Sequence, residues 1–194
     1  MTGIAAIVLA AGRGTRFGEA PKLLADLDGK PVIQHVAEAA LASSLDPVIL
    51  VSGHRRPEIE AALDGLPLQL AFNPAFADGL STSLRTGFAA LPPERAAMVL
   101  LGDMPRVKPT LIDRLAAAWR GAGGPAALVP VHDGRRGNPV VLSHLLAPEV
   151  ARLAGDAGAG PLLRGRDDVV LWPADDPAVL QDVDTAAALD ALRG

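Results

Sequence analysis

Residues 3–24 read GIAAIVLAAGRGTRFGEAPKLL, and this stretch holds the pattern that decides the fold. The apolar run Ile4–Ala10 has the length of one buried strand, and glycines and polar residues follow it directly. Gly12, Gly14 and Gly18 leave backbone N–H groups open to an approaching anion. A buried strand that runs into such a loop is typical of the ligand edge of an α/β sheet.

The charges of this loop favour a polyphosphate ligand. Arg13, Arg16 and Lys22 supply positive charge, and Thr15 supplies a hydroxyl group. A solvated surface loop with incidental arginines is the competing interpretation.

Two common phosphate-binding motifs do not fit. A P-loop is absent, because no glycine stands five residues before a Gly-Lys pair. A dinucleotide fingerprint requires its third glycine one residue before Gly18 and a helix that starts at once, but Pro21 interrupts. It also requires an acidic residue after the second strand, where the chain reads Ser52-Gly53-His54. The loop therefore favours a nucleoside triphosphate gripped by an extended loop and a distal lysine.

Apolar runs alternate with helix-like stretches along the rest of the chain. The pattern predicts strands at 4–10, 48–52, 68–72, 97–101, 126–131, 139–142 and 169–172. It predicts helices at 31–43, 57–63, 81–91, 109–120, 148–154 and 185–193. This alternation predicts a three-layer α/β/α fold with a Rossmann-like, mostly parallel sheet, whose ligands lie beyond the carboxyl ends of the strands.

Composition narrows the class of protein. The 194 residues suit a single domain, 1–194, and a net charge of −4 argues against a nucleic-acid partner. The absence of cysteine excludes disulfides and thiolate metal sites. The first apolar run lacks a basic leader and is too short to span a membrane, so we expect a cytoplasmic protein with no membrane partner.

Two aspartates are candidate ligands for Mg²⁺. Asp103 directly follows an apolar strand in MVLLGDMP, at the edge of the sheet where ligands bind. A turn or helix-capping role is the alternative. In QDVDTAAAL, Asp184 is the favoured second ligand over Asp182, while Asp184 or Thr185 alternatively caps the last helix. The four histidines show no metal-ligand spacing, and we expect each to be structural or solvated.

The stretches IVLAAGRGTRFGEAPKLL and LLGDMP, with GLSTSLRTG and GRRGNPVVL further along, resemble the MobA-like nucleotidyltransferases. The match is most similar to the molybdenum cofactor cytidylyltransferases and spans nearly the whole chain. The resemblance implies a nucleotidyltransferase-type fold and transfer of CMP from CTP to the terminal phosphate of molybdopterin, with release of pyrophosphate. It also implies Mg²⁺ as cofactor and a molybdoenzyme or its maturation chaperone as a further partner.

The resemblance also implies roles for individual residues. Those expected to bind the nucleotide are Leu9, Ala10, Ala11, Gly12, Arg13, Gly14, Thr15, Lys22, Ser81, Thr82 and Ser83. Lys22, Arg16 and Asp103 are the expected catalytic residues, and Asp103 and Asp184 the metal ligands. Gly137, Asn138 and Pro139 are expected to shape the acceptor side.

Two departures from the family pattern bear on substrate choice. Gly160 stands where the family usually carries an arginine, and Arg164 or Arg166 is the expected substitute on the acceptor side. The sequence DTAAA replaces the usual DTPED near the end of the chain.

Other functions compete with cytidylyl transfer. The alternatives are guanylyl transfer to the same pterin, nucleotidyl transfer to a phosphosugar or phosphopolyol, and a non-catalytic carrier of the cofactor. Ala11 favours CTP, because guanylyl-transferring members usually carry glycine there. A dehydrogenase is disfavoured by the missing acidic residue after Ser52.

Overall fold

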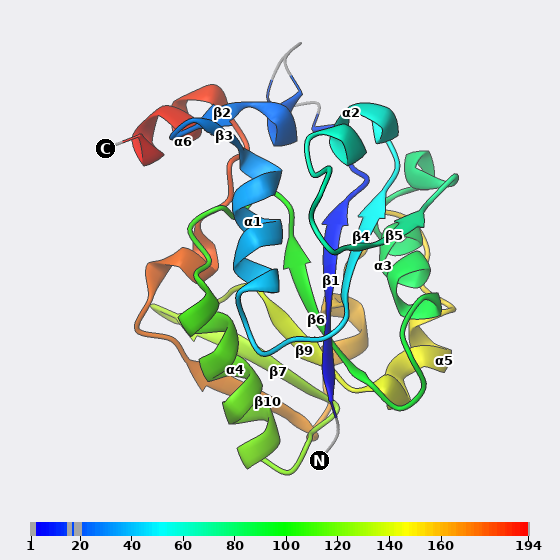
Figure 1. The fold of residues 1–194 in the computed structure, drawn as a ribbon. Coiled ribbons are helices and arrows are strands. Elements are labelled where there is room, and N and C mark those ends of the chain that lie inside the picture. The colour runs from blue at the N-terminus through cyan, green and yellow to red at the C-terminus, as the bar shows by residue number, and fades with distance from the viewer. Residues whose placement is uncertain (1–2, 15–16, 18–20, 194) are drawn as a thin grey trace.

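The computed structural model describes residues 3–14, 17 and 21–193 (Figure 1). Its central sheet has the strand order β10-β7-β9-β6-β1-β4-β5. These strands are β1 (Ile4–Ala10), β4 (Val48–Ser52), β5 (Gln69–Phe72), β6 (Ala96–Leu101), β7 (Ala127–His132), β9 (Val140–Leu142) and β10 (Val169–Pro173). Strand β9 is antiparallel to β6 and β7, whereas the other neighbours along this path are parallel. The expected mostly parallel sheet is confirmed.

Helices cover both faces of the sheet and complete three layers (Figure 1). The helices are α1 (Val32–Leu41), α2 (Arg56–Ala61), α3 (Leu80–Ala89), α4 (Pro109–Gly121), α5 (Ala147–Val150) and α6 (Ala186–Leu192). Side chains alternate along β1, so that Val8 packs into the core beneath α1 and α4, and Ile7 packs into the core beneath α3 and α5. The fold is therefore the predicted three-layer α/β/α arrangement.

A small accessory core lies beyond the carboxyl end of β1. The two-stranded hairpin of β2 (Asp26–Leu27) and β3 (Lys30–Pro31) lies beside α6 at this edge of the sheet (Figure 1). Leu27, Val183 and Leu189 form its buried centre. This core brings the last part of the chain to the edge where the ligand is expected.

Several elements differ from the sequence prediction. The helix expected at 148–154 is only one turn, α5, and a 3₁₀ turn at His144–Leu146 precedes it. The β2–β3 hairpin and β8 (Arg135–Arg136), which pairs with β7, were not expected. Strands of two residues contain too few positions to show a hydrophobic period. Short 3₁₀ segments also occur at Lys22–Leu24, Phe76–Asp78, Gly160–Leu163 and Pro177–Leu180.

Candidate functional site

A cleft of about 690 Å³ opens at the carboxyl ends of the central strands. Residues that follow β1, β4, β5 and β6 line it, together with Lys22 and the start of α3. The chain runs from β1 outward to β4 and β5 and then returns to β6 on the other side of β1, so the sheet changes direction between β1 and β6. Such a switch point is where open α/β sheets bind ligands, and the volume suits a small organic molecule.

Gly102 brings Asp103 close to the end of β1. Its backbone N–H donates to the carbonyl of Leu9 at 3.0 Å. A Cβ at Gly102 would lie 2.8 Å from that carbonyl oxygen and 2.8 Å from Ile33 Cδ1, so any larger residue would push the two strands apart. Gly102 therefore holds Asp103 at the switch point, at the ligand-binding edge of the sheet that the sequence predicted for it.

Lys22 joins the two predicted metal ligands. Its Nζ donates to Asp103 Oδ2 at 2.6 Å and to Asp184 Oδ1 at 3.0 Å. The side chains are 12%, 19% and 39% exposed for Lys22, Asp103 and Asp184, so the lysine is the most enclosed of the three. Burial alone lowers the pKa of Lys22, but the two carboxylates outweigh burial and raise it above its ordinary value. The ammonium is held charged inside the site.

Val183 places Asp184 in this group. Its side chain is fully buried in the accessory core, and its backbone N–H donates to the carbonyl of Asp103 at 2.9 Å. The next residue, Asp184, then lies beside Asp103, although the two are 81 positions apart. Of the capping roles weighed from the sequence, the side-chain cap of α6 comes from Thr185, whose hydroxyl accepts from Ala188 N at 3.1 Å.

The donor groups here fit a hard divalent cation. Asp103 and Asp184 supply carboxylate oxygens, and Oδ1 of Asp103 is buried with no hydrogen-bond partner among the described residues. Mg²⁺ commonly takes one or two protein carboxylates and completes its shell with water and substrate phosphates. Within the described part of the chain, no cluster of three acidic, histidine or cysteine side chains forms a closed metal cage. The site thus fits a cation shared with a phosphate substrate.

A cationic and aromatic wall faces the cleft on the side of β4 and β5. His54, Arg55 and Phe76 line it with Arg13. The rings of His54 and Phe76 are 5.8 Å apart, and the Arg13 guanidinium lies 5.9 Å from the Phe76 ring centre. His54 thus lies at the cleft, just after β4, and the expectation that it is structural or solvated stays a prediction.

The start of α3 contributes both a cleft residue and an internal network. Ser83 lines the cleft, whereas Ser81 and Thr82, which are both buried, are not among its lining residues. Asn73 Nδ2 donates to Thr82 Oγ1 at 2.8 Å and to Ser83 Oγ at 3.1 Å, and Asn73 Oδ1 accepts from Ala75 N at 3.0 Å. Asn73 therefore orders this turn, a role that sequence reasoning missed. A base-binding role for the three hydroxyl residues stays a prediction.

The predicted nucleotide loop is partly visible. Leu9, Ala11, Gly12, Arg13 and Gly14 line the cleft with Lys22. Ala10 is not among the lining residues and belongs to the core on the α1 and α4 face. Thr15 and Arg16 lie outside the described residues.

The predicted acceptor residues are not brought to the cleft lining. Gly137 N donates to Pro130 O and Asn138 N to Val179 O, which ties residues 137–139 to the strands and the 3₁₀ turn beside β7. Arg164 is exposed just after the 3₁₀ segment that contains Gly160.

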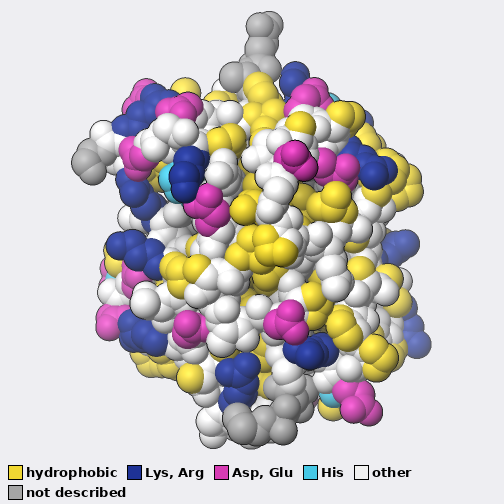
Figure 2. Space-filling view, viewed as in Figure 1, with side chains coloured by type: hydrophobic (Ala, Val, Ile, Leu, Met, Phe, Trp, Pro, Cys, Tyr) yellow, Lys and Arg dark blue, Asp and Glu magenta, His cyan; other side chains and the backbone are white. Residues whose placement is uncertain are grey.

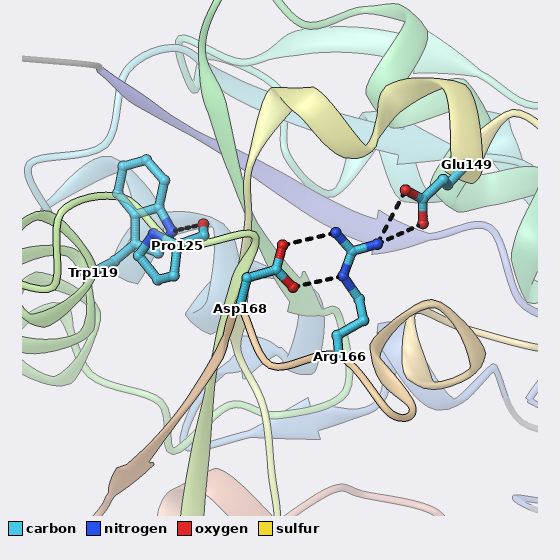
Figure 3. A network of polar contacts seen from close by, with 5 residues as sticks. All are labelled: Trp119, Pro125, Glu149, Arg166 and Asp168. Atoms are coloured by element: carbon cyan, nitrogen blue, oxygen red, sulfur yellow. Dashed lines mark hydrogen bonds and ion pairs between the residues drawn. The ribbon is translucent and has the colours of Figure 1, made fainter.

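Arg166 is engaged away from the cleft. Its guanidinium pairs with Asp168 at 2.8 Å and with Glu149 of α5 at 3.0 Å (Figure 3). Arg166 therefore ties the segment before β10 to α5, and the expectation that it replaces a family arginine on the acceptor side is not supported.

Charged side chains of both signs are interspersed on the face that carries α1 and α4 (Figure 2). No helix in the described ranges is both long and apolar enough to cross a membrane.

Residues 6–171 match the MobA-like NTP transferase domain. The chain belongs to the MobA-like NTP transferase domain family. The match covers the cleft loop, Asp103 and most of the sheet, whereas Asp184 lies beyond it. Family membership confirms the resemblance to the MobA-like nucleotidyltransferases and the expected nucleotidyltransferase-type fold.

Relatives of this MobA-like domain carry several names. A protein named nicotine blue oxidoreductase, from Paenarthrobacter nicotinovorans, is 31% identical over 97% of the chain and 96% of its own length. The crystal structure of Rv0371c from Mycobacterium tuberculosis H37Rv superposes with a TM-score of 0.85 at 30% identity, covering 99% of this chain and 98% of that one. A nucleotidyl transferase from Methanothermobacter thermautotroptrophicus also gives a TM-score of 0.85, at 28% identity, covering 100% and 97% of the two chains. A further structure of Rv0371c is described as a complex with manganese.

Proposed function

We propose that this MobA-like domain transfers the CMP group of CTP to the terminal phosphate of molybdopterin and releases pyrophosphate. Family membership and the structural neighbours support the broader activity, nucleotidyl transfer. The observation that carries the proposal is the meeting of Lys22 with Asp103 and Asp184 at the switch point, beside a glycine-rich loop. This combination offers cationic and backbone donors for a triphosphate and carboxylates for its counter-ion.

In this proposal the cleft residues act by position and charge. Lys22, Arg13 and the backbone N–H groups of the loop hold the triphosphate, and the acceptor phosphate lies in line with the α-phosphorus. One oxygen of the acceptor phosphate forms a bond to the α-phosphorus. The bond between the α-phosphorus and the oxygen of the leaving pyrophosphate breaks at the same time. A phosphate oxygen is already ionised at neutral pH, so no residue has to remove a proton. Asp103 and Asp184 would hold Mg²⁺, which supplies charge neutralisation at the phosphates.

The choice of CTP and molybdopterin rests on the resemblance of the chain's motifs. Ala11, which lines the cleft, is the residue that favours CTP over GTP. Guanylyl transfer to the same pterin, or transfer to a phosphosugar or phosphopolyol, uses the same phosphate-binding residues and differs only in the base or acceptor contacts.

A second function of another class comes from one relative. The protein named nicotine blue oxidoreductase shares 31% identity with this MobA-like domain over nearly the full length of both chains. An oxidoreductase would bind an electron-carrying cofactor in the cleft and transfer electrons in place of a nucleotidyl group.

The deciding experiment measures both reactions on the same preparation. Pyrophosphate release is followed with CTP, GTP, UTP or ATP, each with molybdopterin, a sugar 1-phosphate or a polyol phosphate as acceptor. Oxidation of NADH and NADPH in the presence of the dye nicotine blue is followed in parallel. We expect acceptor-dependent pyrophosphate release that is fastest with CTP and molybdopterin. Release that is fastest with another base or acceptor overturns the substrate assignment, and dye reduction without pyrophosphate release overturns nucleotidyl transfer itself.

A further inference from the structure

Lys22 occupies the position that a cation shared by Asp103 and Asp184 would take. Its Nζ lies 2.6 Å from one carboxylate oxygen and 3.0 Å from the other. A divalent cation bound by both carboxylates needs oxygens at about 2.0–2.6 Å, so it would compete with the ammonium for the space between these two side chains. The ammonium and the metal ion therefore compete at this place, although Asp103 Oδ1 has no hydrogen-bond partner among the described residues.

A positive charge between Asp103 and Asp184 stabilises the ionised form of both carboxylates. Two carboxylates that share a partly enclosed site repel each other unless a positive charge lies between them. Lys22 supplies that charge from within the chain, and its side chain is only 12% exposed. Its presence on both carboxylates opposes entry of a metal ion, both by occupying the oxygens and by repulsion between the two cations.

The lysine stem lies directly beside the loop that is proposed to bind phosphate. A Cβ placed at Gly14 would lie 3.2 Å from Lys22 Cβ and 3.8 Å from its Cε. Four rotatable bonds separate the Lys22 backbone from its ammonium, so the charge has a short path from the carboxylates to an anion on the Gly12–Gly14 loop. A triphosphate bound to this loop would supply oxygens to which the Lys22 ammonium can donate. A metal ion would then supply the positive charge between the two carboxylates in place of the ammonium.

We propose that Lys22 is an internal counter-cation that holds Asp103 and Asp184 until a triphosphate draws it away, so that metal and nucleotide bind cooperatively. This inference rests on the proposed function, because it assigns the triphosphate as the anion that moves the lysine. By linkage, the factor by which nucleotide tightens metal binding equals the factor by which metal tightens nucleotide binding.

The test compares Mn²⁺ affinity in the absence of nucleotide, measured by electron paramagnetic resonance of the free ion. The proteins are wild type, Lys22→Met and the control Lys30→Met. Lys30 also forms an ion pair, with Glu38, but lies on β3 and does not line the cleft. Lys22→Gln serves as a second neutral variant, and melting temperatures verify that each protein is folded.

Removal of the competing ammonium should tighten Mn²⁺ binding about tenfold, which corresponds to about 1.4 kcal/mol. The same variant should bind α,β-methylene-CTP more weakly than wild type, and Lys30→Met should change neither affinity. Tighter Mn²⁺ binding together with weaker nucleotide binding is the result expected for a displaced counter-cation. A lysine that only binds phosphate would leave Mn²⁺ affinity unchanged when it is removed. Loss of a structural lysine would weaken the binding of both Mn²⁺ and nucleotide.

Unchanged or weaker Mn²⁺ binding in both neutral Lys22 variants overturns the inference, as does a lack of Mn²⁺ binding in every protein. These outcomes leave nucleotidyl transfer standing if wild type still releases pyrophosphate from CTP. Failure of wild type to bind any nucleoside triphosphate in the presence of Mn²⁺ overturns the proposed function and, with it, the cooperative part of the inference.

Discussion

Gly79 is the residue at which one added methyl group should disturb the cleft most clearly. Its backbone has φ 107° and ψ 173°, a region that is nearly restricted to glycine. A Cβ at this position would lie 2.4 Å from both the carbonyl carbon and the oxygen of Gly155, and 2.7 Å from Asp156 N. These atoms belong to backbone that cannot turn aside, and the Gly155 carbonyl also accepts from Ser81 N at 3.2 Å.

The expected cost of Gly79→Ala has two parts. The backbone conformation costs about 1–3 kcal/mol for a non-glycine residue. Forcing the Gly155 segment away costs about 1–3 kcal/mol more, as overpacking does elsewhere. We therefore expect a loss of about 4 kcal/mol in the free energy of unfolding, and a melting temperature lower by about 8–16 °C for a chain of this size. Because Gly79 and Asp156 both line the cleft, nucleotide affinity should fall as well.

Gly155→Ala is the matched control. Gly155 also has a positive φ, of 68°, but a Cβ there meets nothing within 4 Å. This variant should lose only about 1–2 kcal/mol, the cost of a left-handed residue. Urea unfolding followed by far-ultraviolet circular dichroism gives both values. If Gly79→Ala lowers the free energy of unfolding no more than Gly155→Ala does, the close approach of Gly79 to the Gly155 backbone is refuted.

Three other predictions test the site and its support. Asn73→Ala should lower the free energy of unfolding by about 2–3 kcal/mol, because it leaves buried Thr82 and Ser83 hydroxyls without their donor, and a urea midpoint unchanged from wild type would contradict this. Asp103→Asn should lower the rate of pyrophosphate release at least 100-fold, as expected when several kcal/mol of charge stabilisation are lost, while circular dichroism remains native; near-normal turnover at saturating Mg²⁺ excludes the proposed role. The raised pKa of Lys22 means that its stabilising effect is complete below its ordinary value of 10.5 and is lost as pH rises through the higher folded-state value. The difference in unfolding free energy between wild type and Lys22→Met should thus stay constant up to pH 10.5 and shrink above it. A difference that shrinks on acidification between pH 9 and 7 would show that a group other than Lys22 causes the pH dependence.

The layered fold was predictable because its signals are local. Each long strand is a continuous apolar run, since both faces of a parallel sheet are covered, and β1 and β4 begin and end where the sequence predicted. The β2–β3 hairpin and the one-turn α5 carry too few residues for a period to be visible. They form because neighbouring segments, including α6 in the accessory core, cover them.

The site was predictable as far as it depends on strand ends. Lys22 and Asp103 meet because a loop after β1 and a loop after β6 share one edge of the sheet. His54 and Phe76 were missed because their proximity depends on how the segments after β4 and β5 turn back over the cleft. The pairing of both carboxylates with one lysine was likewise not visible in the sequence, because burial of Val183 in the accessory core sets it.

The affinity of CTP for wild type and Lys22→Ala, measured by calorimetry with saturating Mg²⁺, tests the central claim most directly. Loss of charge-assisted hydrogen bonds worth about 1.5–3 kcal/mol should weaken CTP binding about 10- to 100-fold, and Lys22→Arg should restore it only in part. Lys30→Ala, which removes a lysine outside the cleft, should bind CTP as wild type does. Normal CTP affinity in Lys22→Ala would contradict the claim that this cleft holds a nucleoside triphosphate through Lys22.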